Sequence, residues 1–215
     1  MAPVTTDRFI AREGVSQTAE DVLLTRAHTL QGVLSLVAQQ GQQVELAVAA
    51  MVQALAAGKL VLACGNGGSA ADAQHMVGEL VGRFQREREP WPAIALTTDS
   101  SILTSISNDH GFDQVFQRQV AAFAQPGGVF IGFSTSGESR NVLNAAREAR
   151  RRGMRVVAFT GQSPSSLSEA AEIVLSVPLA STPLVQEVHA VLLHVVCDMV
   201  ESALADLAQR KESVA

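Results

Sequence analysis

The sequence predicts an α/β fold in which a doubly wound, five-stranded parallel sheet is flanked by helices and preceded by N-terminal helices. Short apolar runs alternate with helical patterns from residue 60 to about residue 208, and this alternation is typical of a parallel sheet covered on both faces. Two of the runs end in glycine- or serine-rich turns directly before a helix. The 215 residues, 47% of them hydrophobic, suffice for one such domain with a substantial core.

The N-terminal part of the chain is predicted to be helical. Apolar residues recur at helical spacing over about 18–40 and again over about 43–57, and Gly58 ends the second helix. The domain organisation that follows is an N-terminal arm at 1–16 and a single domain at 17–210, with N-terminal helices at 17–57 and the α/β core and C-terminal helix at 58–210.

The remaining elements follow in chain order. Apolar runs bounded by turn residues predict strands at 60–63, 93–96, 129–133, 155–159 and 172–177. Helices are predicted from residue 69 to Arg83-Phe84, over 102–106, 112–123 and 141–152, in a short segment before the last strand, and from Ser181-Thr182-Pro183 to about 208. Residues 108–111 read as a turn.

The first glycine-rich turn, Gly65-Asn66-Gly67-Gly68-Ser69, lies between a strand and a helix. This layout presents backbone N–H groups to an anion at a helix N-terminus, and Ser69 adds a hydroxyl. Ala70 stands where the dinucleotide fingerprint has its third glycine, and no Gly-Lys-Ser/Thr of a P-loop follows. A tight turn without a ligand is therefore an equal alternative when this motif is taken alone.

The same helix carries His75 and Glu79, which are four residues apart and so share one face. An imidazole and a carboxylate in this arrangement can form an acid/base pair or contribute two metal ligands. A surface pair without chemistry is the commoner meaning of this spacing alone.

A second turn of the same kind, Ser134-Thr135-Ser136-Gly137-Glu138-Ser139, follows the third predicted strand. If the strand order is 2-1-3-4-5, the first and third strands are neighbours at the switch point, where ligands of such sheets bind. The two turns would then converge on one anion. Hydroxyls without a lysine favour a small sugar phosphate over a nucleoside triphosphate.

Composition excludes several other classes of protein. The net charge is −5 and the one basic cluster, at 147–155, reads as the solvated end of a helix, so a nucleic-acid partner is not expected. The N-terminus has no apolar signal core, and the apolar runs are judged too short to span a bilayer. Cys64 and Cys197 both lie in apolar patterns, which is typical of reduced core thiols in a cytoplasmic protein.

Four segments together resemble the sugar isomerase (SIS) domain family. They are CGNGGS at 64–69, AIALTTD at 93–99, STSGES at 134–139 and QEVHAVLLH at 186–194, and the likeness runs from about Gln43 to Leu204. Within the family the chain is most similar to the bacterial phosphoheptose isomerases. The resemblance implies a flavodoxin-like SIS fold and an aldose–ketose isomerase that converts sedoheptulose 7-phosphate to D-glycero-D-manno-heptose 7-phosphate through an enediol. Its product would supply heptose for lipopolysaccharide or another glycan.

The resemblance also implies the site residues. Phosphate binding falls to Ser69, Ser134, Thr135, Ser136 and Ser139, and the other substrate contacts to Asn66, Gly67, Gly68, Glu79, Asp99 and Gln186. One Zn²⁺ per subunit would be held by His75, Glu79, Gln186 and His194, with Glu79 and His194 as the acid/base pair. Related enzymes are homotetramers with sites at subunit interfaces. The chain departs from the family at Pro183, where an aspartate that contacts substrate is expected.

Helix geometry alone favours His189 over His194 as the second metal ligand on the last helix. Gln186 and His194 are eight residues apart, about 12 Å along an ideal helix, whereas His189 lies only three residues from Gln186. The resemblance selects His194, which leaves His189 as a supporting or core-facing histidine. His28 and His110 have no partner in the sequence pattern and are expected to be ordinary surface or loop residues.

Two other functions of this family remain open at this stage. One is a non-catalytic SIS scaffold that regulates DNA replication initiation by binding a partner protein. The presence of all four residues of the acid/base and metal set favours the enzyme. The other is a sugar-phosphate sensor, which is usually fused to a DNA-binding domain, and the segment before Thr18 is too short for one.

Overall fold

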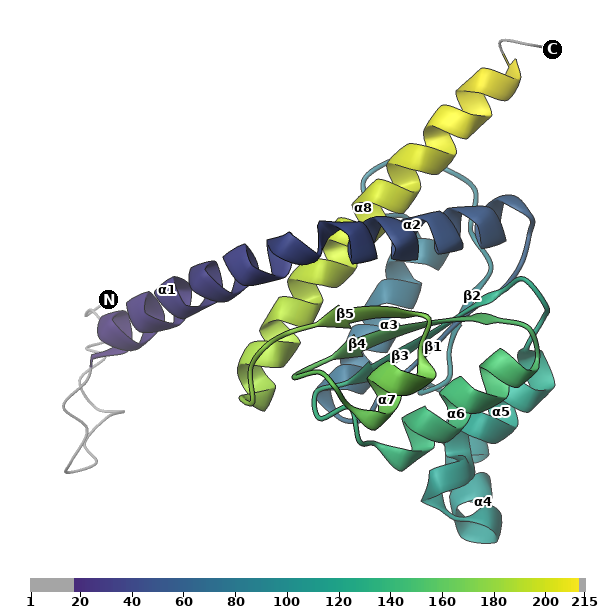
Figure 1. The fold of residues 1–215 in the computed structure, drawn as a ribbon. Helices are drawn as coiled ribbons and strands as arrows, with labels where there is room; N and C mark the ends of the chain where they lie inside the picture. The colour runs from purple at the N-terminus through teal and green to yellow at the C-terminus, as the bar shows by residue number, and fades with distance from the viewer. Residues whose placement is uncertain (1–17, 213–215) are drawn as a thin grey trace, which may run out of the picture.

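The computed structural model describes residues 18–212, and its centre is one parallel five-stranded sheet (Figure 1). The strands are β1 (Val61–Cys64), β2 (Ala93–Ala95), β3 (Val129–Ser134), β4 (Arg155–Thr160) and β5 (Ile173–Ser176). Their order is β2-β1-β3-β4-β5, and every neighbouring pair is parallel. The predicted fold class and strand order are confirmed. β1 and β3 are neighbours, with Cys64 beside Gly132 in register.

Helices cover both faces of the sheet, as alternate residues of each strand require. They are α1 (Ala19–Val37), α2 (Gly41–Ala56), α3 (Gly68–Val81), α4 (Ser100–His110), α5 (Val115–Phe123), α6 (Arg140–Arg151), α7 (Ser166–Ala170) and α8 (Thr182–Glu212). One buried cluster joins α2, α3 and α8 to Ile131 and Phe133 of β3. A second joins α5, α6 and α7 to Phe130 on the opposite face.

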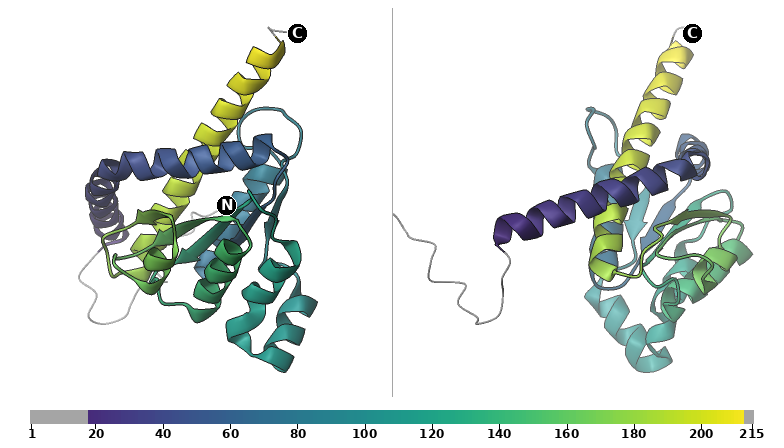
Figure 2. Two further views of the ribbon diagram at one scale, coloured as in Figure 1. Left: turned by 45° about the vertical axis from the view of Figure 1, so that its right-hand side comes forward. Right: turned by 60° about the vertical axis from the view of Figure 1, so that its left-hand side comes forward.

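The first and last helices extend beyond the α/β core. Both α1 and the C-terminal part of α8 project away from the sheet (Figures 1 and 2). By length and composition alone, Thr182–Gln209 of α8 could cross a membrane, so the expectation that every apolar run is too short was wrong for this segment. Its apolar residues have another explanation, because α8 packs in the core against α2 and α3.

Several predicted boundaries needed correction. Residues 108–110 are the end of α4 rather than a turn, because Asp99 caps the N-terminus of this helix and Gly111, with φ of 86°, ends it. α3 ends at Val81, before Arg83-Phe84. The last helix was predicted to end at about residue 208, and α8 continues to Glu212. The predicted arm at 1–16 lies outside the described residues.

Both cysteines are unpaired and buried in the core, as expected. Burial raises the pKa of the Cys64 thiol well above its usual value, and burial is also the main reason that the pKa of Cys197 rises to about 12. The thiols are therefore protonated at neutral pH and pack as small apolar groups.

Candidate active site

The two predicted anion-binding turns meet at the carboxyl ends of β1 and β3. The side-chain amides of Asn66, in the first turn, and Asn141, at the start of α6, exchange two hydrogen bonds of 2.9 Å each. The two turns therefore lie close together, as expected, on the side of the sheet where parallel folds bind ligands, and their binding of one anion stays a prediction. Asn141 was missed as a site residue, because in the sequence it looks only like the first residue of a helix.

Two glycines of the first turn, Gly65 and Gly67, are required by its geometry. Gly67 has φ of 56° and precedes α3. A Cβ on Gly65 would overlap the backbone of Ser69, and one on Gly68 would lie 2.5 Å from the Gln186 amide. Ser69 itself is buried at the start of α3. The backbone is thereby drawn close to the place where an anion would lie.

The second turn is organised by its own hydroxyls. Ser134 Oγ donates to Ser139 Oγ at 3.0 Å and accepts from the Gly137 N–H at 3.1 Å, while Ser136 Oγ accepts from the Glu138 N–H at 3.1 Å. The Glu138 carboxylate accepts a hydrogen bond from the backbone N–H of Ser166 at 2.8 Å. This bond directs the negative charge of Glu138 toward the start of α7 rather than toward the turn. The predicted residues Ser134, Ser136 and Ser139 thus lie together at the N-terminus of α6.

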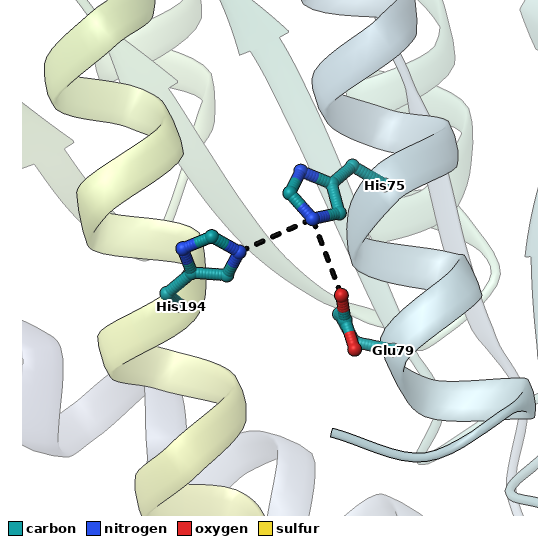
Figure 3. Close-up of side chains that lie close together, drawn as sticks. All are labelled: His75, Glu79 and His194. Atoms are coloured by element: carbon teal, nitrogen blue, oxygen red, sulfur yellow. Dashed lines mark hydrogen bonds and ion pairs between the residues drawn. The ribbon is translucent and has the colours of Figure 1, made fainter. Parts of the chain in front are cut away.

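His75, Glu79 and His194 form a compact cluster between α3 and α8 (Figure 3). His75 Nε2 lies 3.2 Å from Glu79 Oε1 and 3.1 Å from His194 Nε2, and all three ligand atoms lie within 4.8 Å of one another. The side chains of His75 and Glu79 are 43% and 22% exposed, so the cluster is open to solvent on one side. The structure thus brings together three of the four residues that the resemblance assigned to zinc.

This cluster fits a zinc ion. Two imidazole nitrogens that face each other at 3.1 Å must share a proton or a cation, because otherwise both present lone pairs. Zinc takes His nitrogens and Glu oxygens at about 2.0–2.2 Å, which places tetrahedral ligands about 3.4 Å apart. The two short distances of the cluster are close to that spacing.

Gln186 and His189 occupy different surroundings on α8. Because α3 and α8 run side by side, the Gln186 amide lies against Gly68, at the phosphate end of α3. Its membership of the zinc ligand set stays a prediction. His189 is completely buried and packs against the rings of Phe133 and Phe159. The interpretation of His189 as core-facing is confirmed.

Three further residues near the site complete the comparison with the sequence. Asp99 is exposed and caps α4 by accepting from the Ile102 N–H, while its contact to a sugar stays a prediction. Pro183 lies in the first turn of α8, where a missing N–H costs nothing. Asp72, one turn before His75, was missed by sequence reasoning: burial raises its pKa to about 6, opposed by the charge of His75.

Comparison with known proteins identifies the family. The family model for the SIS domain matches residues 27–161. The phosphoheptose isomerase of Geobacter sulfurreducens is 52% identical over 154 residues, which are 72% of this chain and 82% of that protein. The chain belongs to the SIS domain family and, within it, to the phosphoheptose isomerases.

Solved structures agree with this family assignment. Phosphoheptose isomerase from Neisseria gonorrhoeae superimposes with a TM-score of 0.80 at 38% identity, covering 86% of this chain and all of that one. The phosphoheptose isomerase from Francisella tularensis gives a TM-score of 0.81 at 35% identity with the same coverage. The SIS fold predicted from the sequence is thereby confirmed.

Proposed function

We propose that this phosphoheptose isomerase family member interconverts sedoheptulose 7-phosphate and D-glycero-D-manno-heptose 7-phosphate. The observation that carries the proposal is that one helix, α3, begins at the converged turns and carries His75 and Glu79 two and three turns further on, where His194 joins them. Anion binding and proton transfer are thus joined by one rigid element. The scaffold alternative is not favoured, because relatives at about 50% identity bear enzyme names and the acid/base pair is present.

The turns would hold the phosphate and so fix the far end of the sugar. Backbone N–H groups at the starts of α3 and α6 favour a dianion, and the hydroxyls of Ser69, Ser134 and Ser139 supply further hydrogen bonds. Holding this non-reacting group positions C1 and C2 of the open-chain sugar beside Glu79 and His194.

The reaction moves two hydrogens. Glu79 takes the carbon-bound proton from C1 of the ketose, which leaves an enediol, and returns it to C2 to give the aldose. His194 transfers the second proton, which leaves O1 and reaches O2 as the carbonyl moves from C2 to C1. Zinc, which His75, Glu79 and His194 would hold with Gln186 as a proposed fourth ligand, would supply a Lewis acid for the carbonyl oxygen. His75 meanwhile keeps Glu79 oriented through their 3.2 Å contact.

Proton NMR of the protein with sedoheptulose 7-phosphate in D₂O tests the proposal. We expect aldose signals with deuterium at C2, since a proton held by Glu79 exchanges with solvent. Glu79→Gln should abolish turnover and leave phosphate affinity intact, while the exposed control Glu169→Gln should keep wild-type rates. Failure of the wild-type protein to form aldose, with and without added zinc, would refute the assignment.

We further propose that the enzyme is a cytoplasmic homotetramer with sites at subunit interfaces, acting in the synthesis of lipopolysaccharide or another heptose-containing glycan. The support for assembly is an exposed apolar surface on the projecting helices, which includes Val22, Leu23, Leu24 and Leu36 of α1 and Val191, Val195 and Met199 of α8. A hollow of about 300 Å³ lies between α1, α2 and α8. Light scattering after size exclusion tests the state, and Val195→Glu should dissociate it.

A further inference from the structure

A loop between α3 and β2 is attached to α8 through a buried ion pair. Arg88 lies in this loop, and its Nε is 3.1 Å from Glu201 Oε1 of α8. The Arg88 side chain is 12% exposed and that of Glu201 is 2% exposed. The Arg88 guanidinium also stacks on the ring of Trp91, 3.4 Å from its centroid. Neither charged residue belongs to the site predicted from the sequence.

Arg88 also closes the C-terminal end of the helix that carries Glu79. Its Nη2 donates to the backbone carbonyl of Glu79 at 2.7 Å, and its Nη1 donates to that of Leu80 at 3.0 Å. A helix end leaves such carbonyls without partners inside the helix, and a cation is favourable at this end of the helix dipole. The position of the Glu79 backbone thus depends on Arg88.

Glu201 holds the start of the same loop. Its carboxylate accepts from the backbone N–H groups of Phe84, Gln85 and Arg86 at 3.2, 2.9 and 2.9 Å. Burial by itself raises the pKa of Glu201, but these bonds and Arg88 together hold the pKa below its usual value. The Glu201 carboxylate is therefore charged, and groups of the loop donate its hydrogen bonds.

The Arg88–Glu201 pair is connected to the cluster of His75, Glu79 and His194 through both α3 and α8. His194 and Glu201 are seven residues apart on α8, so they lie on nearly the same face, about 10 Å apart along the axis. Phe84, whose N–H Glu201 binds, packs its ring against that of His194 with centroids 5.6 Å apart. On the other side, Arg88 binds the Glu79 carbonyl. The cluster of His75, Glu79 and His194 is therefore bracketed by this pair.

We propose that Arg88 and Glu201 are a positioning pair that sets the distance between Glu79 on α3 and His194 on α8. The inference rests on the proposed function of that cluster. A displacement of 1 Å in a catalytic group can cost about 100-fold in rate, and these two groups come from different helices. A buried ion pair adds little net stability compared with apolar packing, so the main effect of this pair is expected in the geometry of the cluster.

The test compares Glu201→Gln and Arg88→Lys with wild type in three measurements: kcat, KM, and zinc affinity by competition with a chromophoric chelator. We expect kcat to fall and the zinc dissociation constant to rise by about 10–100-fold, the effect of losing groups that orient metal ligands. KM should stay within about twofold, because the phosphate-binding turns are untouched.

The matched control is Glu148→Gln. Glu148 is also a buried glutamate, 8% exposed, and is paired with Arg151 and Arg152 on α6, away from the cluster. Its loss should lower stability and leave kcat and zinc affinity unchanged. Folded Glu201→Gln or Arg88→Lys protein with wild-type kcat and zinc affinity would overturn the proposal, as would equal losses in Glu148→Gln.

The design separates this proposal from the proposed function. If wild type fails to isomerise any heptose phosphate, the function is refuted, and zinc affinity still decides whether the pair positions the cluster. If Glu201→Gln does not fold, Arg88→Lys decides, because it keeps the positive charge and loses the planar guanidinium that binds the two carbonyls and Glu201 and stacks on Trp91.

Discussion

Because His189 is buried in the core, the free energy of unfolding should depend on pH over a defined range. His189 is fully buried, and its Nε2 lies 3.1 Å from the carbonyl oxygen of Thr160, while Nδ1 has no partner among the described residues. Burial lowers the pKa of His189 from 6.5 to about 4, with the hydrogen bond to Thr160 opposing the change. The folded protein thus keeps this imidazole neutral where the unfolded chain would protonate it.

The size of the effect follows from that difference. Between about pH 6.5 and pH 4 the unfolded chain binds a proton that the folded protein does not, so the free energy of unfolding falls as pH falls through this window. Integrated over the window, His189 accounts for roughly 3 kcal/mol of lost stability. Above pH 6.5 the contribution is constant, and below pH 4 both states are protonated, so it changes no further.

Urea unfolding at intervals from pH 7.5 to 4.5, in the presence of a chelator, measures this contribution. His189→Gln keeps an N–H donor for Thr160 but cannot titrate, so its stability should fall less steeply with decreasing pH than that of wild type. The control His28→Gln removes an exposed imidazole and should follow wild type. If wild type and His189→Gln lose stability in parallel across the window, the reasoning is wrong.

Three further predictions concern the site. Asn141→Ala should lower the free energy of unfolding by about 1–3 kcal/mol, because the amide of Asn66 loses its partner; an unchanged urea midpoint would contradict this. Gly65→Ala forces a Cβ against the backbone of Ser69 and should weaken phosphate binding in calorimetry by about tenfold, or 1.4 kcal/mol, whereas Gly78→Ala, in open space on α3, should not. Chelation should abolish turnover, and zinc should restore it where magnesium does not, since imidazole ligands favour zinc; equal recovery with magnesium argues against this metal.

Much of the fold was predictable because two signals agreed. Apolar runs ended at residues that favour turns, and a strand order of 2-1-3-4-5 placed both predicted anion-binding turns at one switch point. The helix carrying His75 and Glu79 was predictable for the same reason, since its start was marked by glycines. α4 was predicted too short because its surface is mostly exposed and offers little apolar periodicity, and its limits depend on Asp99 and Gly111.

The site residues that sequence reasoning missed act through distant partners. Asn141 and Asn66 are 75 residues apart, and Arg88 and Glu201 are 113 apart, so neither pair has a local spacing that would reveal it. A signal did exist for Glu201: its helical spacing from Leu193, Cys197 and Leu204 places it on the apolar face of α8, and a buried charge requires partners. His194 could be chosen over His189 only through family resemblance, because the spacing from Gln186 alone favours His189, and the two histidines lie on different faces of α8.

The arrangement of α3 explains why one helix suffices to join recognition to chemistry. Its first turn lies at the phosphate-binding turns, and His75 and Glu79 lie seven and eleven residues beyond Gly68. With a rise of 1.5 Å per residue, these residues lie about 10–16 Å along the axis from the helix start. Their side chains lie somewhat closer to the start, because helical side chains tilt toward the N-terminus. A phosphate held at the start therefore sets how far an extended sugar reaches toward Glu79. Removing two carbons shortens such a chain by about 2.5 Å, taking bond lengths near 1.5 Å, and that is enough to withdraw C1 from the carboxylate. On the proposed assignment of the phosphate site, a rigid helix selects chain length, and the side chains around C3 to C6 need only distinguish the hydroxyl configuration.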